Sequence, residues 1–599
     1  MARERVRSQI EEGANGQGVS RWPVREGHLL FKDVGTHHYA KRGKLVKKQR
    51  KEIMIRRVRG RRGKAMIGCV GVVVLAATLF APYAWAEKNV IVMIPDGCSI
   101  SIQTLARWYK GKALALDGIL VGAVRTYAAN SVITDSAAAV TAFATGHKST
   151  CGFLSVGPRT KDLLTGFKPT ADPYKPLATV LEGARLKGKA TGLVATSRVS
   201  HATPAGYACH IHDRDLDNEI MEQMVYQEVD VVFGGGKQHL LPTNQGGKRK
   251  DGENLLQVLR ERGYQFVETQ AEMAALAGGK AWGLFASDHM AADIDRAEFA
   301  PTQPSLADMA AKAIELLCED REGFFLLVEG SQVDWAGHAN DPIHMLTDFL
   351  AFDRAVEIAL NFAEADGDTL VIAFPDHNTG GLSIGHGSTS VDYTKTTVEA
   401  LVAPLMRMRI TADGLSKKIG GDLAEKNIRE KIREWWGINA ASEDAEEVLY
   451  LHKKKGLSLK YALGEVVSRK HTVLGWTTHG HSGEDVPLWA YGPSRPLGLV
   501  DNTQLAAIVA AALGFDLGKT TGRLFVDADE AYAGCYVLDK TDPENPVLLI
   551  QGRAKLPVGK DILVLDSLRY NLEGIVVRAP TTGKVYLPQE AVNVINSAP

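Results

Sequence analysis

The stretch "NVIVMIPDG", residues 89–97, is a short apolar run that ends in a proline, an acid and a glycine. Runs of about four to eight apolar residues rich in valine and isoleucine are typical of strands buried on both faces of a sheet. The same pattern recurs at "ATGLVAT" (190–196), "DVVFGG" (230–235), "FFLLVEG" (324–330), "DTLVIAF" (368–374) and "VPLWAYG" (486–492). These runs predict the buried strands of one sheet.

Helical patterns lie between these runs. "SLADMAAKAIELLCED" (305–320) and "TDFLAFDRAVEIALNFAEA" (347–365) place apolar residues at helical spacing. Strands that alternate with amphipathic helices predict an α/β fold with a largely parallel central sheet and helices on both faces. Folds of this kind place their functional sites at the carboxyl ends of the strands.

Two segments depart from the alternation. Residues 390–475 are charged and rich in helical patterns, among them "EKNIREKIREWWGI", and are inserted between two predicted strands. Residues 533–599 consist of short apolar runs separated by turn residues, which predicts a small β module. We therefore expect a main domain over residues 87–532 that contains the insertion, followed by the module.

The formal net charge of the chain is zero, but its charges are unevenly distributed. Residues 41–64 carry thirteen lysines and arginines and one acid, and residues 1–64 together have a net charge of +13. Residues 87–599 therefore have a net charge of −13. An acidic body argues against nucleic acid as a partner.

Residues 54–86 have the layout of a secretory signal peptide: a basic region, an apolar run and the sequence "AWA" at its end. Cleavage after Ala86 is expected, and an uncleaved membrane anchor over residues 65–86 is the alternative. Residues 1–53 precede this signal, and we interpret them as an over-extended start, so that residues 1–86 form the targeting region. Export predicts a periplasmic or extracellular location, which is oxidising.

Polar side chains follow nearly every predicted strand. Asp334 and His338 are four positions apart, so on a helix they share one face and could hold one cation. Asp376 and His377 are adjacent beyond a strand end, where the turning backbone can aim both at a metal ion. Imidazole together with carboxylate suits zinc, whereas an all-oxygen set suits magnesium. The other candidates near strand ends are Asp96, Thr203, Arg214, Glu329 and His481.

The run "ITDSAAAVTAFATGH", residues 133–147, predicts an alanine-rich helix with Asp135 and Ser136 at its head. Serine and aspartate are common at the first positions of helices because their side chains accept hydrogen bonds from free backbone N–H groups. From these residues alone, Ser136 is either part of a helix cap or a nucleophile.

Four motifs, "TDSAAAVTAFATG", "VEGSQVDWAGH", "PDHNTGG" and "HSGEDVPLWAYGP", resemble the alkaline phosphatase family and occur in the same order along the chain. The resemblance covers residues 88–515. It implies the three-layer α/β/α sandwich of that family, and it implies that residues 390–475 are an enlarged form of the family's crown insertion. Such insertions flank the mouth of the site or the dimer interface, so the resemblance also implies a homodimer.

The resemblance implies a role for each candidate residue. Ser136 matches the nucleophile that forms a phosphoserine intermediate, Arg214 matches the arginine that binds two phosphate oxygens, and Asp135 matches the aspartate that orients this arginine. Two zinc ions and one magnesium ion are implied as cofactors. The implied ligands are Asp334, His338 and His481 for the first zinc, Asp96, Asp376 and His377 for the second, and Asp96, Thr203 and Glu329 for the magnesium.

The sequence varies within the family at two positions beside the metals. His201 stands where members carry Asp or His, and Trp335 stands where they carry Lys, His or Trp. Both positions lie near the phosphate, so the identity of the third metal and the affinity for phosphate depend on them. His479 is close to His481 in the chain and is an alternative ligand, but the motif "HSGEDV" favours His481.

The expected function is the hydrolysis of phosphate monoesters by a secreted enzyme, with release of inorganic phosphate and an alcohol. A sulfatase needs a C/S-x-P-x-R signature at its nucleophile, whereas Ala137 and Ala138 follow Ser136. Phosphodiesterase relatives commonly use threonine as nucleophile and lack the third-metal set, which is present here as Thr203 and Glu329. A non-catalytic phosphate-binding protein is expected to have lost a ligand or the nucleophile, and none is lost.

Overall fold

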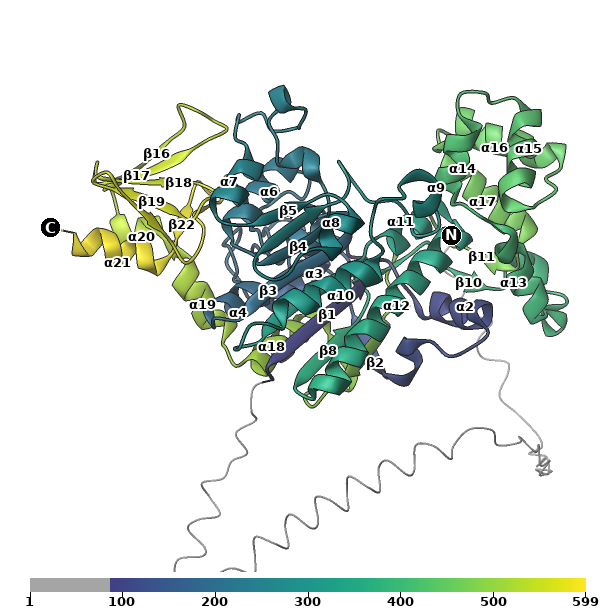
Figure 1. Cartoon of the computed structure of the whole chain (residues 1–599), viewed down its shortest axis with the longest axis horizontal. Helices are drawn as coiled ribbons and strands as arrows, with labels where there is room; N and C mark the ends of the chain where they lie inside the picture. The colour runs from purple at the N-terminus through teal and green to yellow at the C-terminus, as the bar shows by residue number, and fades with distance from the viewer. Residues whose placement is uncertain (1–86, 599) are drawn as a thin grey trace, which may run out of the picture. The chain divides into compact units, whose positions relative to one another are not determined.

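The computed structural model describes residues 87–598, and the predicted targeting region, residues 1–86, lies outside the described residues. A ten-stranded sheet forms the centre of the fold, in the order β14-β2-β13-β8-β1-β7-β3-β4-β6-β5 (Figure 1). Its strands are β1 (Asn89–Pro95), β2 (Leu120–Arg125), β3 (Ala190–Arg198), β4 (Val231–Gly235), β5 (Gln265–Val267), β6 (Ala281–Leu284), β7 (Phe324–Gly330), β8 (Thr369–Ala373), β13 (Val486–Tyr491) and β14 (Gly498–Asp501).

The sheet is largely parallel, as predicted. Only β13 runs against its neighbours β8 and β2, and all other neighbouring pairs are parallel. The six strands predicted from the sequence form one block, from β13 to β4, at the middle of the sheet. The four strands that the sequence pattern missed lie at the two ends, where β2, β5 and β14 are partly exposed and their residues are less uniformly apolar.

Alternate residues of β1 face two different cores. Val90, Val92 and Ile94 belong to one buried cluster, and Ile91 and Met93 belong to another, because successive side chains of a strand point to opposite faces. Helices cover both faces, which confirms the three-layer α/β/α sandwich (Figure 1). They are α2 (Ile100–Lys110), α10 (Leu306–Leu317) and α12 (Pro342–Asp366) on one face, and α3 (Ser136–Thr145), α4 (Val180–Leu186), α6 (Asp217–Tyr226) and α18 (Asn502–Leu513) on the other.

Helix α12 begins earlier than its predicted start at residue 347. Pro342 is its first residue, and the side chain of Asp341 accepts hydrogen bonds from the backbone N–H groups of Ile343 and His344 at 3.2 Å each. Proline is compatible with the first helical position because the N–H that it lacks has no partner there in any helix. The cap, rather than the apolar periodicity, therefore sets this boundary.

The predicted insertion forms a helical lobe, drawn in green in Figure 1. Two short strands, β10 (Ser383–Ile384) and β11 (Leu474–Gly475), pair in antiparallel fashion at its base. Trp436 is buried, and its indole N–H donates to the carbonyl oxygen of Ile410 at 2.8 Å. The helices of the lobe are α13 (Val398–Arg407), α14 (Ala412–Ile419), α15 (Glu425–Trp436), α16 (Ser442–Lys453) and α17 (Leu459–His471).

The C-terminal residues form a module, drawn in yellow in Figure 1, with its own apolar core. An antiparallel sheet has the order β16-β17-β18-β19-β20, and a smaller sheet has the order β15-β22-β21. The strands are β15 (Val526–Asp527), β16 (Tyr536–Asp539), β17 (Val547–Ile550), β18 (Ala554–Pro557), β19 (Ile562–Leu565), β20 (Leu568–Asn571), β21 (Val577–Arg578) and β22 (Val585–Leu587). Helices α20 (Ala528–Tyr532) and α21 (Gln589–Ser597), which the sequence pattern did not predict, accompany them.

Within the described part of the chain, no single helix is both long and apolar enough to cross a membrane. Helix α18 and helix α19 (Leu517–Leu524), which meet at a bend of 89°, pass such a test only as a pair, by length and composition. The apolar residues of α18 are buried in the core beside α3.

Candidate active site

The carboxyl ends of β8, β1 and β7, which are neighbours in the sheet, bring polar side chains from distant parts of the sequence together. Asp96 follows β1, Glu329 is near the end of β7, and Asp376 and His377 follow β8. All four side chains are buried. The polar residues predicted at strand ends therefore converge on one region of the fold.

Three groups of imidazole and carboxylate ligands lie in this region, and in each group the ligand atoms are within 4.8 Å of one another. Asp96 is shared by two groups, as expected for neighbouring metal sites. His479, the alternative ligand considered from the sequence, instead places its Nε2 2.9 Å from Glu465 and is in none of them. The groups are Asp334, His338 and His481; Asp96, Asp376 and His377; and Asp96, His201 and Glu329.

Backbone carbonyl groups orient two of the histidines. Nδ1 of His338 donates to the carbonyl oxygen of His479 at 2.5 Å, and Nδ1 of His481 donates to that of Thr134 at 2.8 Å. In each ring Nδ1 is thereby engaged with the backbone, and Nε2 is the nitrogen that faces the other members of the ligand group. These Nε2 atoms lie 3.4 and 3.6 Å from the two carboxylate oxygens of Asp334.

Several buried polar atoms of the site have no hydrogen-bond partner in the described residues. Such atoms are rare in folded proteins unless a ligand or ion satisfies them. Burial and neighbouring carboxylates raise the pKa values of Asp96 and Asp376, so ionising them requires a nearby positive charge. The residues thus fit bound cations. The unsatisfied atoms are both carboxylate oxygens of Asp96, Oγ1 of Thr203, Oε1 of Glu329, Oδ2 of Asp376 and Nδ1 of His201.

Asp334 differs from the other carboxylates. Burial alone would raise its pKa, but the hydrogen bond to His338 and the charge of that imidazole outweigh burial and hold the pKa well below the usual range. Burial lowers the pKa of His377, which is therefore neutral. Asp334 is a carboxylate and His377 a neutral imidazole at neutral pH, and both are the protonation states of metal ligands.

Ser136 is the first residue of α3 and is almost completely buried. Its Oγ lies 3.2 Å from Nε2 of His377. The N-cap is Asp135, whose Oδ1 accepts from the N–H of Ala138 at 3.0 Å and whose Oδ2 accepts from that of Gly152 at 2.9 Å. The hydroxyl group of Ser136 thus lies at the positive end of a helix and beside one of the ligand groups.

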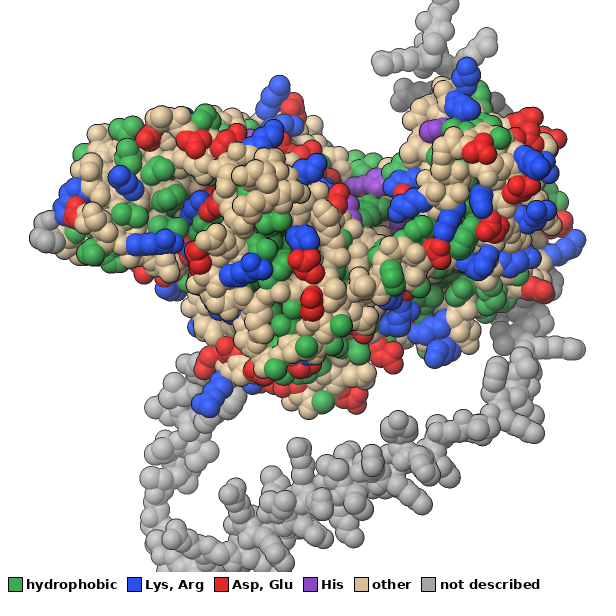
Figure 2. Space-filling view, turned by 45° about the horizontal axis from the view of Figure 1, so that its top comes forward, with side chains coloured by type: hydrophobic (Ala, Val, Ile, Leu, Met, Phe, Trp, Pro, Cys, Tyr) green, Lys and Arg blue, Asp and Glu red, His purple; other side chains and the backbone are tan. Residues whose placement is uncertain are grey.

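Arg214 comes from the loop before α6 and reaches the same region. Its Nη1 donates to Oδ2 of Asp135 at 3.4 Å, and its Nη2 lies 3.2 Å from Nε2 of His201. Its side chain remains partly exposed, so it can contact a substrate. Figure 2 shows histidine side chains at the bottom of a hollow beside the helical lobe.

Trp335 and His201, which the resemblance places beside the metals and the phosphate, lie next to each other. Their ring centroids are 5.8 Å apart, and His289 packs against Trp335 at 4.3 Å. His289 is not predicted from the sequence, because no nearby motif distinguishes it. Nor is Thr379, whose hydroxyl group donates to Oδ1 of Asp334 and lies 3.3 Å from Nδ1 of His377. Thr379 could have been found, because it belongs to the motif "PDHNTGG".

Thr203 lies in the short helix α5 (Ala202–Ala205), which directly follows His201.

Gly97 allows the close approach of the chain after β1 to α11 (Gln332–Ala339), which carries Asp334. Its φ is +70°, and a Cβ atom there would lie 2.6 Å from the Cα atom of Asp334. Only glycine meets both conditions without displacing the backbone.

A metal-dependent hydrolase of phosphate esters requires a nucleophile and a phosphate-binding cation beside its metal ligands. Here a buried serine and an arginine face groups of histidines and carboxylates. The family model described as alkaline phosphatase matches residues 87–515. The chain therefore belongs to the alkaline phosphatase family, and its enzyme class is phosphoric monoester hydrolase. The C-terminal module lies beyond the matched residues.

Individual relatives agree with this assignment. Alkaline phosphatase 3 of Bacillus subtilis is 37% identical over 452 residues, which are 72% of this chain and 90% of the relative. The crystal structure of Thermus thermophilus alkaline phosphatase has a TM-score of 0.64 at 29% identity and covers 72% of this chain and 92% of its own. A mutant of the TAB5 alkaline phosphatase with Mg bound in the M3 site has a TM-score of 0.51 at 25% identity and covers 72% of this chain and 99% of its own.

Proposed function

We propose that the protein hydrolyses phosphate monoesters through a phosphoserine intermediate on Ser136. The observation that carries this proposal is the position of the Ser136 hydroxyl group, 3.2 Å from Nε2 of His377, at the N-terminus of α3. A serine hydroxyl group is a weak nucleophile at neutral pH and needs a site that stabilises its ionised form. The helix N-terminus and the neighbouring ligand groups supply such a site.

We propose that the three groups hold two zinc ions and one magnesium ion. The first zinc would be held by Asp334, His338 and His481, the second by Asp96, Asp376 and His377, and the magnesium by Asp96, Thr203 and Glu329. When bound, these ions would lower the pKa of a coordinated hydroxyl group or water molecule and neutralise charge that develops on the phosphate oxygens.

The third group has a mixed character. Asp96, Thr203 and Glu329 offer the oxygen ligands that magnesium prefers, and the TAB5 mutant is a relative with Mg in its M3 site. His201 adds an imidazole to the same group, and imidazole ligands favour zinc. Metal analysis of the purified protein, together with that of a His201→Asp variant, distinguishes the two ions.

The side chains of the site define the two chemical steps. Arg214 presents a planar fork of N–H donors to two phosphate oxygens, and Asp135 holds it in place. Oγ of Ser136 forms a bond to phosphorus while the bond from phosphorus to the ester oxygen breaks, and the alcohol leaves with a proton. A water oxygen then forms a bond to phosphorus, the bond to Oγ breaks, and inorganic phosphate leaves.

The decisive experiment compares p-nitrophenyl phosphate, bis-p-nitrophenyl phosphate and p-nitrophenyl sulfate with zinc and magnesium present. We expect the monoester to be turned over fastest at alkaline pH, exhaustive chelation to abolish turnover, and Ser136→Ala to remove the phosphoenzyme trapped by acid quench. Faster turnover of the diester or the sulfate, or full activity after chelation, would contradict the proposal.

We also propose that the enzyme is exported, with cleavage after Ala86, and that it forms a homodimer. The basic and apolar layout of residues 54–86 and the "AWA" sequence support export. N-terminal sequencing of the mature protein tests the cleavage, and light scattering tests the dimer. A mature chain that begins before residue 87 would contradict cleavage after Ala86.

A further inference from the structure

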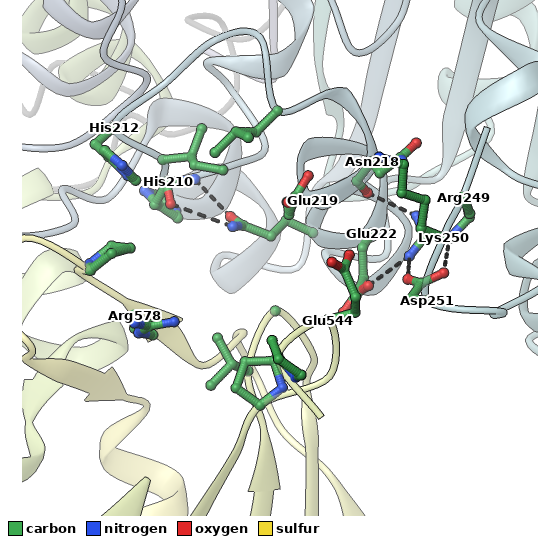
Figure 3. Close-up of a pocket in the computed structure, with 18 residues that line it drawn as sticks. His210, His212, Asn218, Glu219, Glu222, Arg249, Lys250, Asp251, Glu544 and Arg578 are labelled. Carbon is green, nitrogen blue, oxygen red and sulfur yellow. Dashed lines mark hydrogen bonds and ion pairs between the residues drawn. The ribbon is translucent and has the colours of Figure 1, made fainter. Parts of the chain in front are cut away.

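The two additions to the central sheet, the C-terminal module and the helical lobe, differ in how they contact the candidate active site. The module and the main domain enclose a cavity of about 200 Å³ (Figure 3). The buried Arg249 in its wall is paired with Glu222 and Asp251. Of the described residues that line this cavity, none belongs to the three ligand groups. The lobe, in contrast, contacts one of these groups.

Helix α17 of the lobe packs directly on helix α11, which carries Asp334 and His338. Gly464 of α17 lies at this contact, where a Cβ atom would overlap the carbonyl oxygen of Ala339. Two backbones that approach this closely leave no room for a side chain between them, so glycine is required. The next residue of α17, Glu465, therefore lies beside the site.

His479 connects α17 to this ligand group. Its Nε2 lies 2.9 Å from Oε2 of Glu465, and its ring stacks on that of Tyr461, one turn earlier in α17, with centroids 5.6 Å apart and an interplanar angle of 5°. Its Nδ1 donates to the carbonyl oxygen of His338 at 2.7 Å. In return, Nδ1 of His338 donates to the carbonyl oxygen of His479 at 2.5 Å. The two histidines thus exchange a pair of hydrogen bonds.

Backbone bonds hold the other side of the segment to which His479 belongs. The N–H of Gly380 donates to the carbonyl oxygen of Gly480, and the N–H of Thr477 donates to that of Gly380, both at 2.9 Å. The segment leads directly into β12 (His481–Ser482), which pairs with β9. This part of the chain is therefore held between β9 and α17, and His479 joins it to α17.

The pair of His479 and Glu465 is too exposed to stabilise the fold substantially. The two side chains are 31% and 30% exposed, and ion pairs in such positions contribute little. A chemically similar pair, His471 with Asp444 at 2.8 Å, lies at the end of the same helix. His479 differs from His471 because its second ring nitrogen binds the backbone of the helix that carries the ligand group.

We propose that His479 is a positioning residue of the candidate metal site. Held by α17 of the lobe, it fixes the orientation of His338 and the position of His481, and thereby strengthens zinc binding by their ligand group. Hydrogen bonds that orient a metal-binding imidazole typically change metal affinity by about 10- to 100-fold. The inference rests on the proposed function, because it requires that this group holds zinc.

Stepwise removal of zinc from the purified protein by a chromophoric chelator tests the inference. The wild-type protein and His338→Ala, which lacks one proposed ligand, first identify the zinc ion that the group holds. His479→Ala should weaken the affinity for this ion by about tenfold and change that for the other zinc little. His479→Asn should restore most of the loss, because its amide group can donate to the carbonyl oxygen of His338 from nearly the position of Nδ1.

The results separate this inference from the proposed function. Unchanged zinc affinity in His479→Ala, with a zinc ion that His338→Ala does lose, overturns the inference alone. A wild-type protein that holds no zinc ion sensitive to His338→Ala overturns the proposed metal site and the inference with it.

Further variants test whether α17 acts through His479. Glu465→Ala should weaken the affinity for the same zinc by about threefold, and adding it to His479→Ala should cause no further loss, because Glu465 then has no imidazole to hold. His471→Ala breaks the matched pair in the same helix and should leave zinc affinity unchanged. Additive losses in the double variant, or an equal loss in His471→Ala, overturn the role of α17.

Discussion

Asp135 shows how one side chain can serve both a helix and a site. One carboxylate oxygen caps α3 through the N–H of Ala138, and the other accepts from Gly152 and from Arg214. The capping role follows from geometry and needs no charge, because asparagine caps helices as well as aspartate does. The orienting role needs the negative charge. The two roles can therefore be separated by substitution.

Asp135→Asn keeps the cap on Ala138 but turns an NH2 group toward the N–H of Gly152, so it should lower the free energy of unfolding by about 1 kcal/mol. Asp135→Ala loses the cap as well and should lower it by about 2 kcal/mol. Both variants should raise the KM for p-nitrophenyl phosphate by about tenfold, because Arg214 loses a charge-assisted hydrogen bond. Urea unfolding and steady-state kinetics measure the two effects. A normal KM in Asp135→Asn would show that the carboxylate does not orient Arg214.

Glu329 should make metal binding depend on pH. Burial raises the pKa of Glu329 in the metal-free protein to about 8, so at pH 7 the carboxyl group carries a proton that a metal ion must displace. Magnesium binding should therefore release more protons at pH 7 than at pH 9, where the group is already ionised, and magnesium affinity should rise with pH between these values.

Calorimetric titration of the metal-free protein with magnesium, in two buffers of different ionisation enthalpy at each pH, counts the released protons. A Glu329→Gln variant, which has no proton to lose at this position, is the matched control. Equal proton release at pH 7 and pH 9 would exclude Glu329 as the group responsible.

At the scale of elements, the packing of helix α11 on strand β9 (Asn378–Thr379) positions the ligand group of Asp334, His338 and His481. Gly337 of α11 lies against Thr379, and a Cβ atom there would be 2.8 Å from the carbonyl oxygen of Thr379. Thr379 also binds Asp334, which is on the same helix. The close packing of α11 on β9 thus positions the side chains of this ligand group as well as the helix.

Gly337→Ala should lower the free energy of unfolding by about 1–3 kcal/mol, because the backbone of Thr379 must move to admit the methyl group. It should also weaken metal retention, because Asp334 and His338 move with α11. Gly522→Ala, in the exposed helix α19 with no atom within 4 Å of its new Cβ, should instead stabilise the protein by up to about 1 kcal/mol. The two variants are compared by thermal unfolding and by the metal that each retains after dialysis against a chelator. Equal stability and equal metal retention in both variants would show that the packing of α11 on β9 does not position the ligand group.

The sequence predicted the central elements well and the peripheral ones poorly. The strands from β13 to β4 are buried on both faces, so their apolar runs are continuous and can be recognised in the sequence. Strands β14 and β2, at one end of the sheet, mix exposed, half-buried and buried residues, so their sequences do not stand out as continuous apolar runs. Helix α12 was predicted too short because the apolar pattern does not record its cap at Asp341.

At the scale of the whole molecule, the module is attached to the main domain by buried charges as well as by apolar contacts. Ile575 and Val577 of the module belong to the core cluster of the main domain. Asp561 is buried, and Arg262 provides its paired positive charge. Removing one partner of a buried pair leaves an uncompensated charge, which costs more than removing both.

Arg262→Met should lower the free energy of unfolding by about 3 kcal/mol or more, and the double variant Arg262→Met with Asp561→Leu should recover most of this loss. Denaturant unfolding of the wild-type protein, the two single variants and the double variant gives the four free energies of a double-mutant cycle. Additive losses in the double variant would mean that the pair does not couple the module to the main domain.

The sequence by itself predicted the six central strands and their alternation with helices along the chain, and its motifs indicated a candidate nucleophile and candidate ligands, because these depend on local periodicity and on residue identity. Only the tertiary structure decided which side chains meet. Asp96, His377 and Ser136 are far apart in the chain and come together because β1 and β8 are neighbours and α3 begins beside them. His289 and Thr379, and the cavity between main domain and module, likewise exist only through packing of segments distant in sequence. Strand order and packing are set by the burial of apolar faces over the whole molecule, and no single segment encodes them.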